Sequence, residues 1–224
     1  TECPRPTEQR LRWRLGMEHF YILDTHSDQR EESERQEQLS GEDAEKQAVD
    51  AGFAFLYDAV KNKKTLVFSN SREETEYVTA TLRQIAAGRG DDDIFLIHHG
   101  NLSAALREEA ERKMKDENVV RAVTCATVTM ELGIDIGRLE RVVQMGAPTT
   151  VSSFLQRMGR SGRREAPPEM LMLYREEMPL PNEPLPHLIP WELLRGIAIA
   201  ELYLGERFIE PPHIRNMPLS LAFH

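Results

Sequence analysis

Short apolar runs alternate along the chain with longer segments in which apolar residues return every three or four positions. The apolar runs are 65–68, 94–97, 119–124, 141–145 and 170–174. Runs of this length bounded by polar residues are typical of strands, whereas the longer periodic segments between them predict helices. Strands that alternate with helices in this way predict an α/β fold, in which a parallel sheet is covered by helices on both faces.

Particular residues indicate where the helices begin and end. Ser71 and Ser103 precede two of the periodic segments and are suitable N-caps, and Gly88 and Gly90 follow the first of them. A further helix is expected from Glu42, with caps at 40–41, leading to the strand at 65–68.

The two ends of the chain differ from this regular middle. Alternating apolar residues at 11, 13 and 15 predict an extended incoming strand, with a possible second strand at 20–23, and 26–41 is almost wholly polar. Near the other end, a helix is expected over 191–204, closed by Gly205, and its core side chains are predicted to be Trp191, Leu194, Ala198 and Leu202.

These features divide the chain into three parts. We expect an incoming strand with an acidic linker or insertion at 1–41, a domain of alternating strands and helices at 42–176, and a helical extension at 177–224 that begins an accessory region. The first residue is Thr and the last run stops without an obvious terminator, so a fragment of a longer protein is expected.

Composition narrows the functional classes. No apolar stretch is long enough to span a bilayer, so a cytoplasmic protein without a membrane partner is expected. The two cysteines lie far apart and have no neighbouring ligands at metal spacing, so neither a disulfide framework nor a metal site is indicated. The net charge of −9 is local, because 25–50 contributes −6 and Asp91 to Asp93 contribute −3. Acidity in these segments leaves room for a nucleic-acid groove elsewhere.

The segment QRMGRSGRR at 156–164 is the strongest indication of chemistry. Its arginines present rigid forks of donors that fit phosphate oxygens, and its glycines allow the backbone to approach a ligand. If the segment is helical, Gln156, Arg160 and Arg163 lie on one face. Taken alone, the segment is also compatible with a solvated basic turn after a helix.

The segment is not isolated. TLVFSNSR at 65–72, ATVTMELGIDI at 126–136 and QRMGRSGRR resemble, in order and spacing, motifs IV, V and VI of the second RecA-like domain of superfamily 2 helicases. The resemblance covers about residues 50 to 175. The segment ELGIDIGRLERVVQMGAP is more similar to the corresponding segment of large helicase-related (Lhr-type) proteins than to that of DEAD-box RNA helicases.

The resemblance implies an ATP site shared with another domain. ATP and Mg²⁺ are held mainly by a first RecA-like domain, whose phosphate loop and acidic motif this chain lacks. Arg163 is the implied arginine finger and acts with Arg160 on the γ-phosphate, while Gln156 lies near the attacking water. Asp135 and Gly133 are implied cofactor-binding residues, although a turn-capping role is the alternative for Asp135. Arg157 and Arg164 could instead be structural ion-pair partners, and no role is assigned to them.

The resemblance also implies contacts with a nucleic-acid backbone, made by Thr127, Ser69, Asn70, Arg72, His99 and Gly100. Two alternatives stay open, since 69–72 would equally serve as a helix cap and a histidine pair at 98–99 is as often simply packed. Val128 departs from the family, which usually has Asp or Ser there.

The expected function is therefore the C-terminal motor domain of an ATP-dependent helicase that acts on single-stranded DNA or RNA and is inactive without its first RecA-like domain. A double-stranded DNA translocase without unwinding and a catalytically silent binding module are the alternatives.

Overall fold

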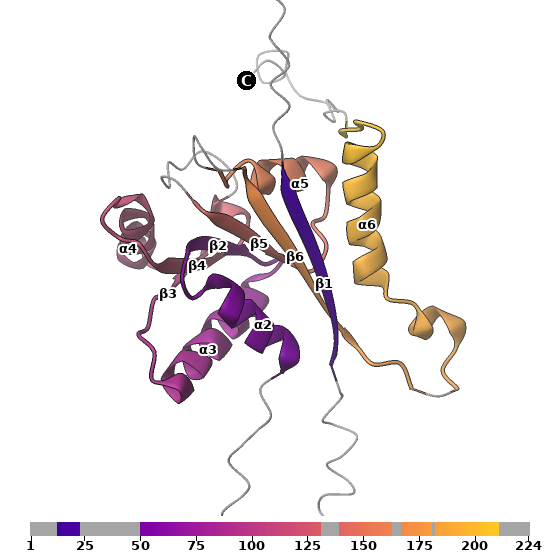
Figure 1. Ribbon diagram of the computed structural model, residues 1–224, viewed down its shortest axis with the longest axis horizontal. Coiled ribbons are helices and arrows are strands. Elements are labelled where there is room, and N and C mark those ends of the chain that lie inside the picture. Colours follow the sequence, from indigo (N-terminus) through magenta and orange to yellow (C-terminus); the bar gives the residue numbers. More distant parts are fainter. Residues whose placement is uncertain (1–12, 23–49, 131–138, 163–166, 181, 211–224) are drawn as a thin grey trace, which may run out of the picture.

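Six parallel strands form the centre of the protein in a computed structural model that describes residues 13–22, 50–130, 139–162, 167–180 and 182–210 (Figure 1). Their order across the sheet is β1-β6-β5-β2-β4-β3. The strands are β1 (Arg14–Ile22), β2 (Lys64–Phe68), β3 (Phe95–His98), β4 (Ala122–Ala126), β5 (Arg141–Met145) and β6 (Glu169–Glu177). Every pairing is parallel, so the predicted α/β fold is confirmed.

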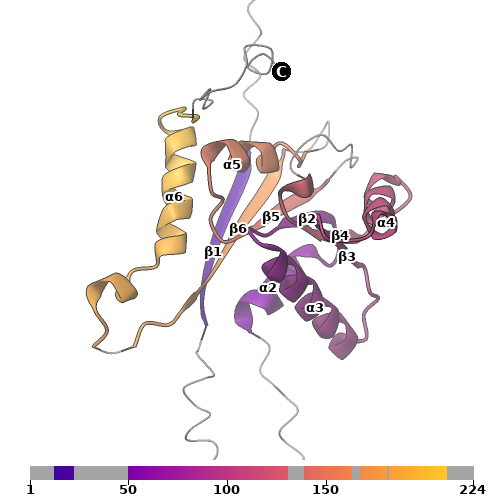
Figure 2. The same cartoon turned by 180° about the vertical axis from the view of Figure 1, so that it is seen from behind.

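Helices cover both faces of this sheet (Figures 1 and 2). They are α2 (Ala51–Val60), α3 (Arg72–Arg89), α4 (Ala104–Lys115), α5 (Val151–Met158) and α6 (Trp191–Leu204), with short 3₁₀ turns η1 (Val128–Met130) and η2 (Leu185–Leu188). Alternate strand residues point to opposite faces. Val67 and Val143 accordingly pack with α2 and α3, whereas Leu66 and Val142 pack on the α4 side. None of the helices in these ranges is long and apolar enough to cross a membrane.

The predicted caps of α3 and α4 are confirmed. Ser71 Oγ accepts a hydrogen bond from the backbone of the third residue of α3, and Ser103 Oγ does the same for α4. Gly90 ends α3 with a φ of 72°, a conformation that glycine adopts without strain. The helix expected from Glu42 is described only from Asp50 onward, because 42–49 lie outside the described residues. In the described part, Asp50 is the N-cap and α2 begins at Ala51, because the Asp50 carboxylate accepts from Phe53 N at 3.1 Å.

The incoming strand is a single element rather than two. All nine residues of β1 pair with β6, from Arg14 beside Glu169 to Ile22 beside Glu177. β1 is therefore an edge strand of the RecA-like sheet itself. The proposed division of the chain at residues 41 and 176 remains a prediction.

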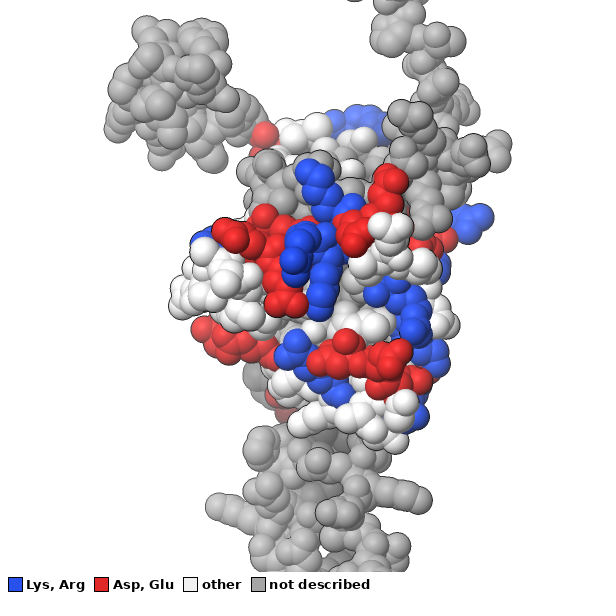
Figure 3. Space-filling view, turned by 90° about the vertical axis from the view of Figure 1, so that its left-hand side faces the viewer, with Lys and Arg blue, Asp and Glu red and all other residues white. Residues whose placement is uncertain are grey.

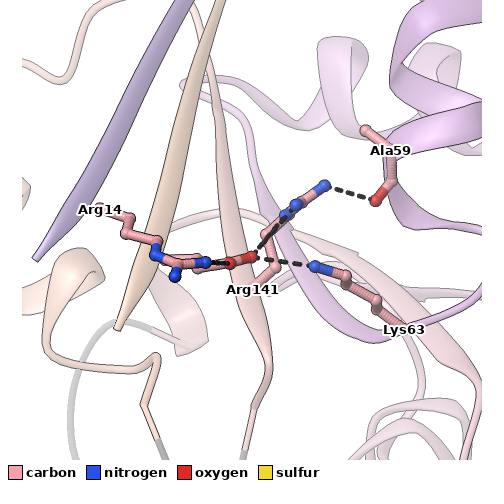
Figure 4. Close-up of polar contacts among 5 residues, drawn as sticks. Arg14, Ala59, Lys63 and Arg141 are labelled. Atoms are coloured by element: carbon pink, nitrogen blue, oxygen red, sulfur yellow. Dashed lines mark hydrogen bonds and ion pairs between the residues drawn. The ribbon is translucent and has the colours of Figure 1, made fainter. Parts of the chain in front are cut away.

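An ion cluster at the amino-terminal edge of the sheet holds β1 in place (Figure 4). The Glu169 carboxylate lies 3.2 Å from Arg14 Nη1, 2.9 Å from Lys63 Nζ and 3.1 Å from Arg141 Nη2, and Arg141 also donates to Ala59 O. Burial acts to raise the pKa of Glu169, but hydrogen bonds from Lys63 and Arg141 outweigh it and hold this pKa below its ordinary value. One carboxylate thus joins β1, β5, β6 and the turn before β2.

The α6 helix has the predicted bounds but the opposite orientation. Trp191, Leu194 and Leu202, predicted to be core, are 52, 43 and 40% exposed, and Ala198 is exposed as well. Gly196 and Ala200 face the sheet instead. A Cβ at Gly196 would lie 1.7 Å from Tyr174 Oη, so only glycine allows α6 to pack against β6 at this point. The core interpretation was therefore wrong.

Candidate functional site at two edges of the sheet

The carboxyl ends of β2, β4 and β3 lie side by side and bring three predicted segments together. Phe68 pairs with Ala126, which pairs with His98. Beyond these pairs, Ser69 N donates to Ala126 O at 2.9 Å and Thr127 N donates to His98 O at 3.3 Å. The segments after the three strands therefore form one continuous edge, as expected for functional loops of a parallel sheet.

Of the residues that follow β2, some are packed in the interior and others are exposed to solvent. Ser69 is fully buried, and its hydroxyl has no hydrogen-bond partner among the described residues. Ser71 is engaged as the cap of α3, so the cap alternative holds at that position. Arg72 is exposed on the first turn of α3 and is the cationic side chain that this loop presents to solvent.

The two histidines after β3 are buried. His98 Nδ1 lies 2.9 Å from Thr129 Oγ1 and its Nε2 lies 2.9 Å from Glu111 Oε1, which ties β3 to η1 and α4. His99 is 2% exposed, and its Nε2 lies 3.1 Å from Glu76 Oε1 without the alignment of a hydrogen bond. Gly100 follows them and is exposed.

Thr127 occupies the end of β4 at the centre of this edge. It is 8% exposed, and its hydroxyl lies 3.4 Å from Thr129 Oγ1. Val128, which stands where the family usually has a polar residue, is 58% exposed. The edge therefore presents an apolar side chain beside Thr127.

A buried polar network links this edge to α5. Arg157 is 1% exposed and donates to Gln144 Oε1 and, at 3.3 Å, to Asn70 Oδ1. The Asn70 amide donates to Ala147 O at 2.8 Å, and the Arg157 guanidinium lies 5.0 Å from the centre of the Phe68 ring. The residue to which the sequence assigned no role is therefore the structural connection between motif IV and motif VI.

Motif VI runs from α5 to the opposite, amino-terminal edge of the sheet. Gln156 lies in α5, but the helix ends at Met158, so the condition for a single helical face with Arg160 is not met. Arg160 N donates to Arg157 O in the following turn, and Ser161 then forms a parallel bridge with Leu139, just before β5. Of the other predicted positions, Gly133, Asp135 and Arg163 lie outside the described residues.

One hydroxyl and one carboxylate hold the beginning of α5. Thr150 Oγ1 accepts from Ser153 N at 3.0 Å, while Glu210 accepts from Val151 N at 2.6 Å and from Ser152 N at 3.0 Å. Burial acts to raise the pKa of Glu210, but these donors outweigh it and the pKa lies below its ordinary value. No local pattern in the sequence indicated that a residue beyond α6 would contact α5.

Charges of both signs mix on the side of the molecule that carries β3, α3 and α4 (Figure 3). Ion pairs there include Arg83 with Asp93, Arg121 with Asp92, and Lys113 with Glu109. Among the described residues on this side, positive charge is balanced locally. This face therefore offers a polyanion little net attraction.

Comparison with known proteins agrees with this arrangement. The family model described as the helicase conserved C-terminal domain matches residues 50–165, more than half of the chain. The chain belongs to this family. It is the second RecA-like domain of a superfamily 2 helicase, as the motifs indicated.

Several relatives are Lhr-type proteins. The chain is 38% identical over 118 residues to the ATP-dependent helicase Lhr-Core of Saccharolobus solfataricus, a match covering 51% of this chain and 13% of the relative. It is 32% identical over 136 residues to the Lhr helicase/uracil glycosylase of Escherichia coli, covering 49% and 9%. The chain thus matches only about a tenth of the length of these relatives.

A solved structure extends the similarity to nearly the whole fold. The helicase Lhr of Mycobacterium smegmatis, solved bound to ssDNA and AMP-PNP, aligns with a TM-score of 0.61 and 25% identity, over 90% of this chain and 23% of the other.

Proposed function

We propose that this chain is the C-terminal motor domain of an ATP-dependent nucleic-acid helicase, and that opposite edges of its sheet contact the nucleic acid and ATP. The observation that carries the proposal is the path of the chain. The segment after β4 begins at the carboxyl edge with Thr127, and the chain reaches the amino-terminal edge at Leu139. Motif VI reaches the same edge at Ser161, beside Leu139.

At the carboxyl edge, we assign the contacts with a single strand of DNA or RNA. Arg72 supplies charge to phosphate oxygens, and Thr127 and Gly100 supply a hydroxyl and an accessible backbone. Ser69 and His99 are buried, so their part is to shape the edge, while Asn70 anchors it to Arg157. Contacts of this kind do not read base sequence and weaken with salt.

At the amino-terminal edge, we assign the contacts with ATP. A first RecA-like domain holds the nucleotide and Mg²⁺, which supplies charge neutralisation on the phosphates. Arg163 and Arg160 then stabilise the negative charge that develops on the γ-phosphate, with Arg163 as the arginine finger. Gln156, whose amide both donates and accepts, orients water, and Asp135 accepts from ribose hydroxyls beside Gly133.

The buried network supports coupling between the edges. Arg157 bonds to Asn70 at the carboxyl edge, and Arg160 follows it by three residues at the start of the motif VI turn. A shift of the loop after β2 is therefore transmitted to the arginines through one rigid, buried side chain. The binding of a strand then biases the closure of the two domains on ATP.

Measurements on the isolated chain test the assignment of nucleic-acid binding to this domain and of the phosphate loop to another. The isolated chain is expected to bind single-stranded oligonucleotides with an affinity that falls as salt rises, but to hydrolyse no ATP above background, because the phosphate loop belongs to another domain. Fluorescence anisotropy and a phosphate-release assay measure both. Turnover by the isolated chain would contradict the two-domain site.

A further inference from the structure

The outer face of α6 and the loop before it form an exposed apolar surface that the proposed motor chemistry does not use. Its members are the exposed side chains of Leu185, Leu188, Trp191, Leu194 and Ile197, which are 70, 42, 52, 43 and 45% exposed. Figure 1 shows α6 standing at the side of the sheet, away from β2, β4 and β3. We call this set the α6 surface. An exposed apolar patch of this kind on a water-facing helix marks an interaction site.

A pocket of about 460 Å³ lies at one end of the α6 surface. Its walls include Tyr21 from the end of β1, Trp191 from the first turn of α6, and Glu176 and Glu177 from the end of β6. The Trp191 indole N–H donates to Pro186 O at 2.7 Å, so its polar group is satisfied within the loop. The face of the Trp191 ring is therefore the part of this side chain that can contact a ligand.

The carboxylates of the pocket are not equivalent. Glu176 is committed to structure, because its Oε1 accepts from Glu192 N at 2.9 Å at the start of α6 and its Oε2 lies 2.9 Å from His19 Nε2. Glu177 is exposed at the carboxyl end of β6. An exposed carboxylate beside two aromatic rings matches a cation, which is attracted both by the negative charge and by the ring faces.

Charge excludes a nucleic acid as the natural occupant. Residues 176–210 contain seven acidic and two basic side chains, a net charge of −5 with His neutral. A phosphate backbone would be repelled by this field, and a second copy of the same surface would bring like charges together. A basic protein segment is attracted to it.

We propose that the α6 surface and its pocket bind a protein partner through a segment in which arginine or lysine is flanked by apolar side chains. The cationic side chain enters the pocket between Trp191 and Tyr21 and pairs with Glu177. The flanking apolar residues cover Leu194 and Ile197. Ion pairing gives the contact its orientation, and the apolar area gives most of its affinity.

The test uses the full chain and a fluorescein-labelled amphipathic peptide of leucine and arginine, with binding followed by anisotropy. The matched probe replaces each arginine by citrulline, which keeps the shape and removes the charge. The arginine peptide is expected to bind more tightly than the citrulline peptide. Glu177→Gln is expected to weaken binding about threefold and Trp191→Ala about fivefold, whereas Glu108→Gln on α4 leaves it unchanged. Thermal melts confirm that the variants fold.

Several results would overturn the proposal. Equal binding of the arginine and citrulline peptides would remove the cationic ligand. Unchanged affinity in both Glu177→Gln and Trp191→Ala would place the peptide elsewhere. Displacement of the peptide by a single-stranded oligonucleotide would assign the surface to nucleic acid, and self-association abolished by Trp191→Ala would assign it to a second copy. None of these assays involves ATP, so the outcome is independent of the proposed motor function.

Discussion

Replacing Arg157 by alanine would remove the only described side chain that joins Gln144, Asn70 and Phe68 at once. Gln144 is fully buried, and losing its guanidinium partner leaves its carbonyl unsatisfied at a cost of about 1–3 kcal/mol. The lost contact with the Phe68 ring adds about 0.5–2 kcal/mol. We therefore expect Arg157→Ala to lower the free energy of unfolding by about 3 kcal/mol.

Urea denaturation of the chain followed by circular dichroism measures this difference directly. Arg72→Ala is the matched control, because Arg72 is exposed and its removal is expected to change stability by no more than about 0.5 kcal/mol. Arg157→Lys should recover only part of the loss, since an ammonium group cannot reproduce the planar guanidinium that lies over the Phe68 ring. A change below about 1 kcal/mol for Arg157→Ala would refute the assignment of Arg157 as the link between the two motifs.

Two further predictions concern the sheet edges and α6. Glu169→Gln should destabilise the chain by about 1–3 kcal/mol near neutral pH, because three cations lose their carboxylate partner. Since the folded pKa of Glu169 is depressed, the contribution of its carboxylate to stability is complete above the unfolded pKa of about 4.3 and is lost as pH falls through the folded value. The stabilities of the wild type and the variant should therefore converge in acid. A difference that persists in acid would contradict the ionic origin. Gly196→Ala should cost about 1–3 kcal/mol in a thermal or urea melt, because the new methyl group meets the Tyr174 ring. An unchanged melting transition would show that α6 adjusts without loss.

The strands and most helix ends could be predicted because they depend on local chemistry. Ser71 and Ser103 cap helices with their own hydroxyls, and Gly90 permits a left-handed turn, so the signal lies within a few residues of the feature. The parallel sheet followed from apolar runs that are buried on both faces.

The exposed face of α6 could not be predicted in the same way. Apolar residues occur on nearly every side of this helix, including Leu193, Leu194 and Ile199, so spacing does not select one face. The face is selected by a distant residue, Tyr174, whose hydroxyl fits only against Gly196. Long-range packing of this kind leaves no local pattern.

The position of Arg157 did leave a signal. Val151, Phe154 and Met158 are the buried apolar residues of α5, and Arg157 lies three positions after Phe154 on the same side. An arginine among apolar residues at helical spacing indicates a buried, hydrogen-bonded group. Its partners are Asn70 in the loop after β2 and Gln144 in β5, and only the fold brings them together.

The most direct test of the motor assignment is nucleic-acid-stimulated ATP hydrolysis by a protein in which this chain is joined to a first RecA-like domain. Single-stranded DNA and RNA should each be tried, with Arg163→Ala, the conservative Arg163→Lys, and Arg195→Ala on the exposed part of α6 as control. We predict stimulation by at least one polymer, a loss of about 10³-fold or more in Arg163→Ala, and no change in Arg195→Ala. Stimulated hydrolysis that survives Arg163→Ala would contradict the account.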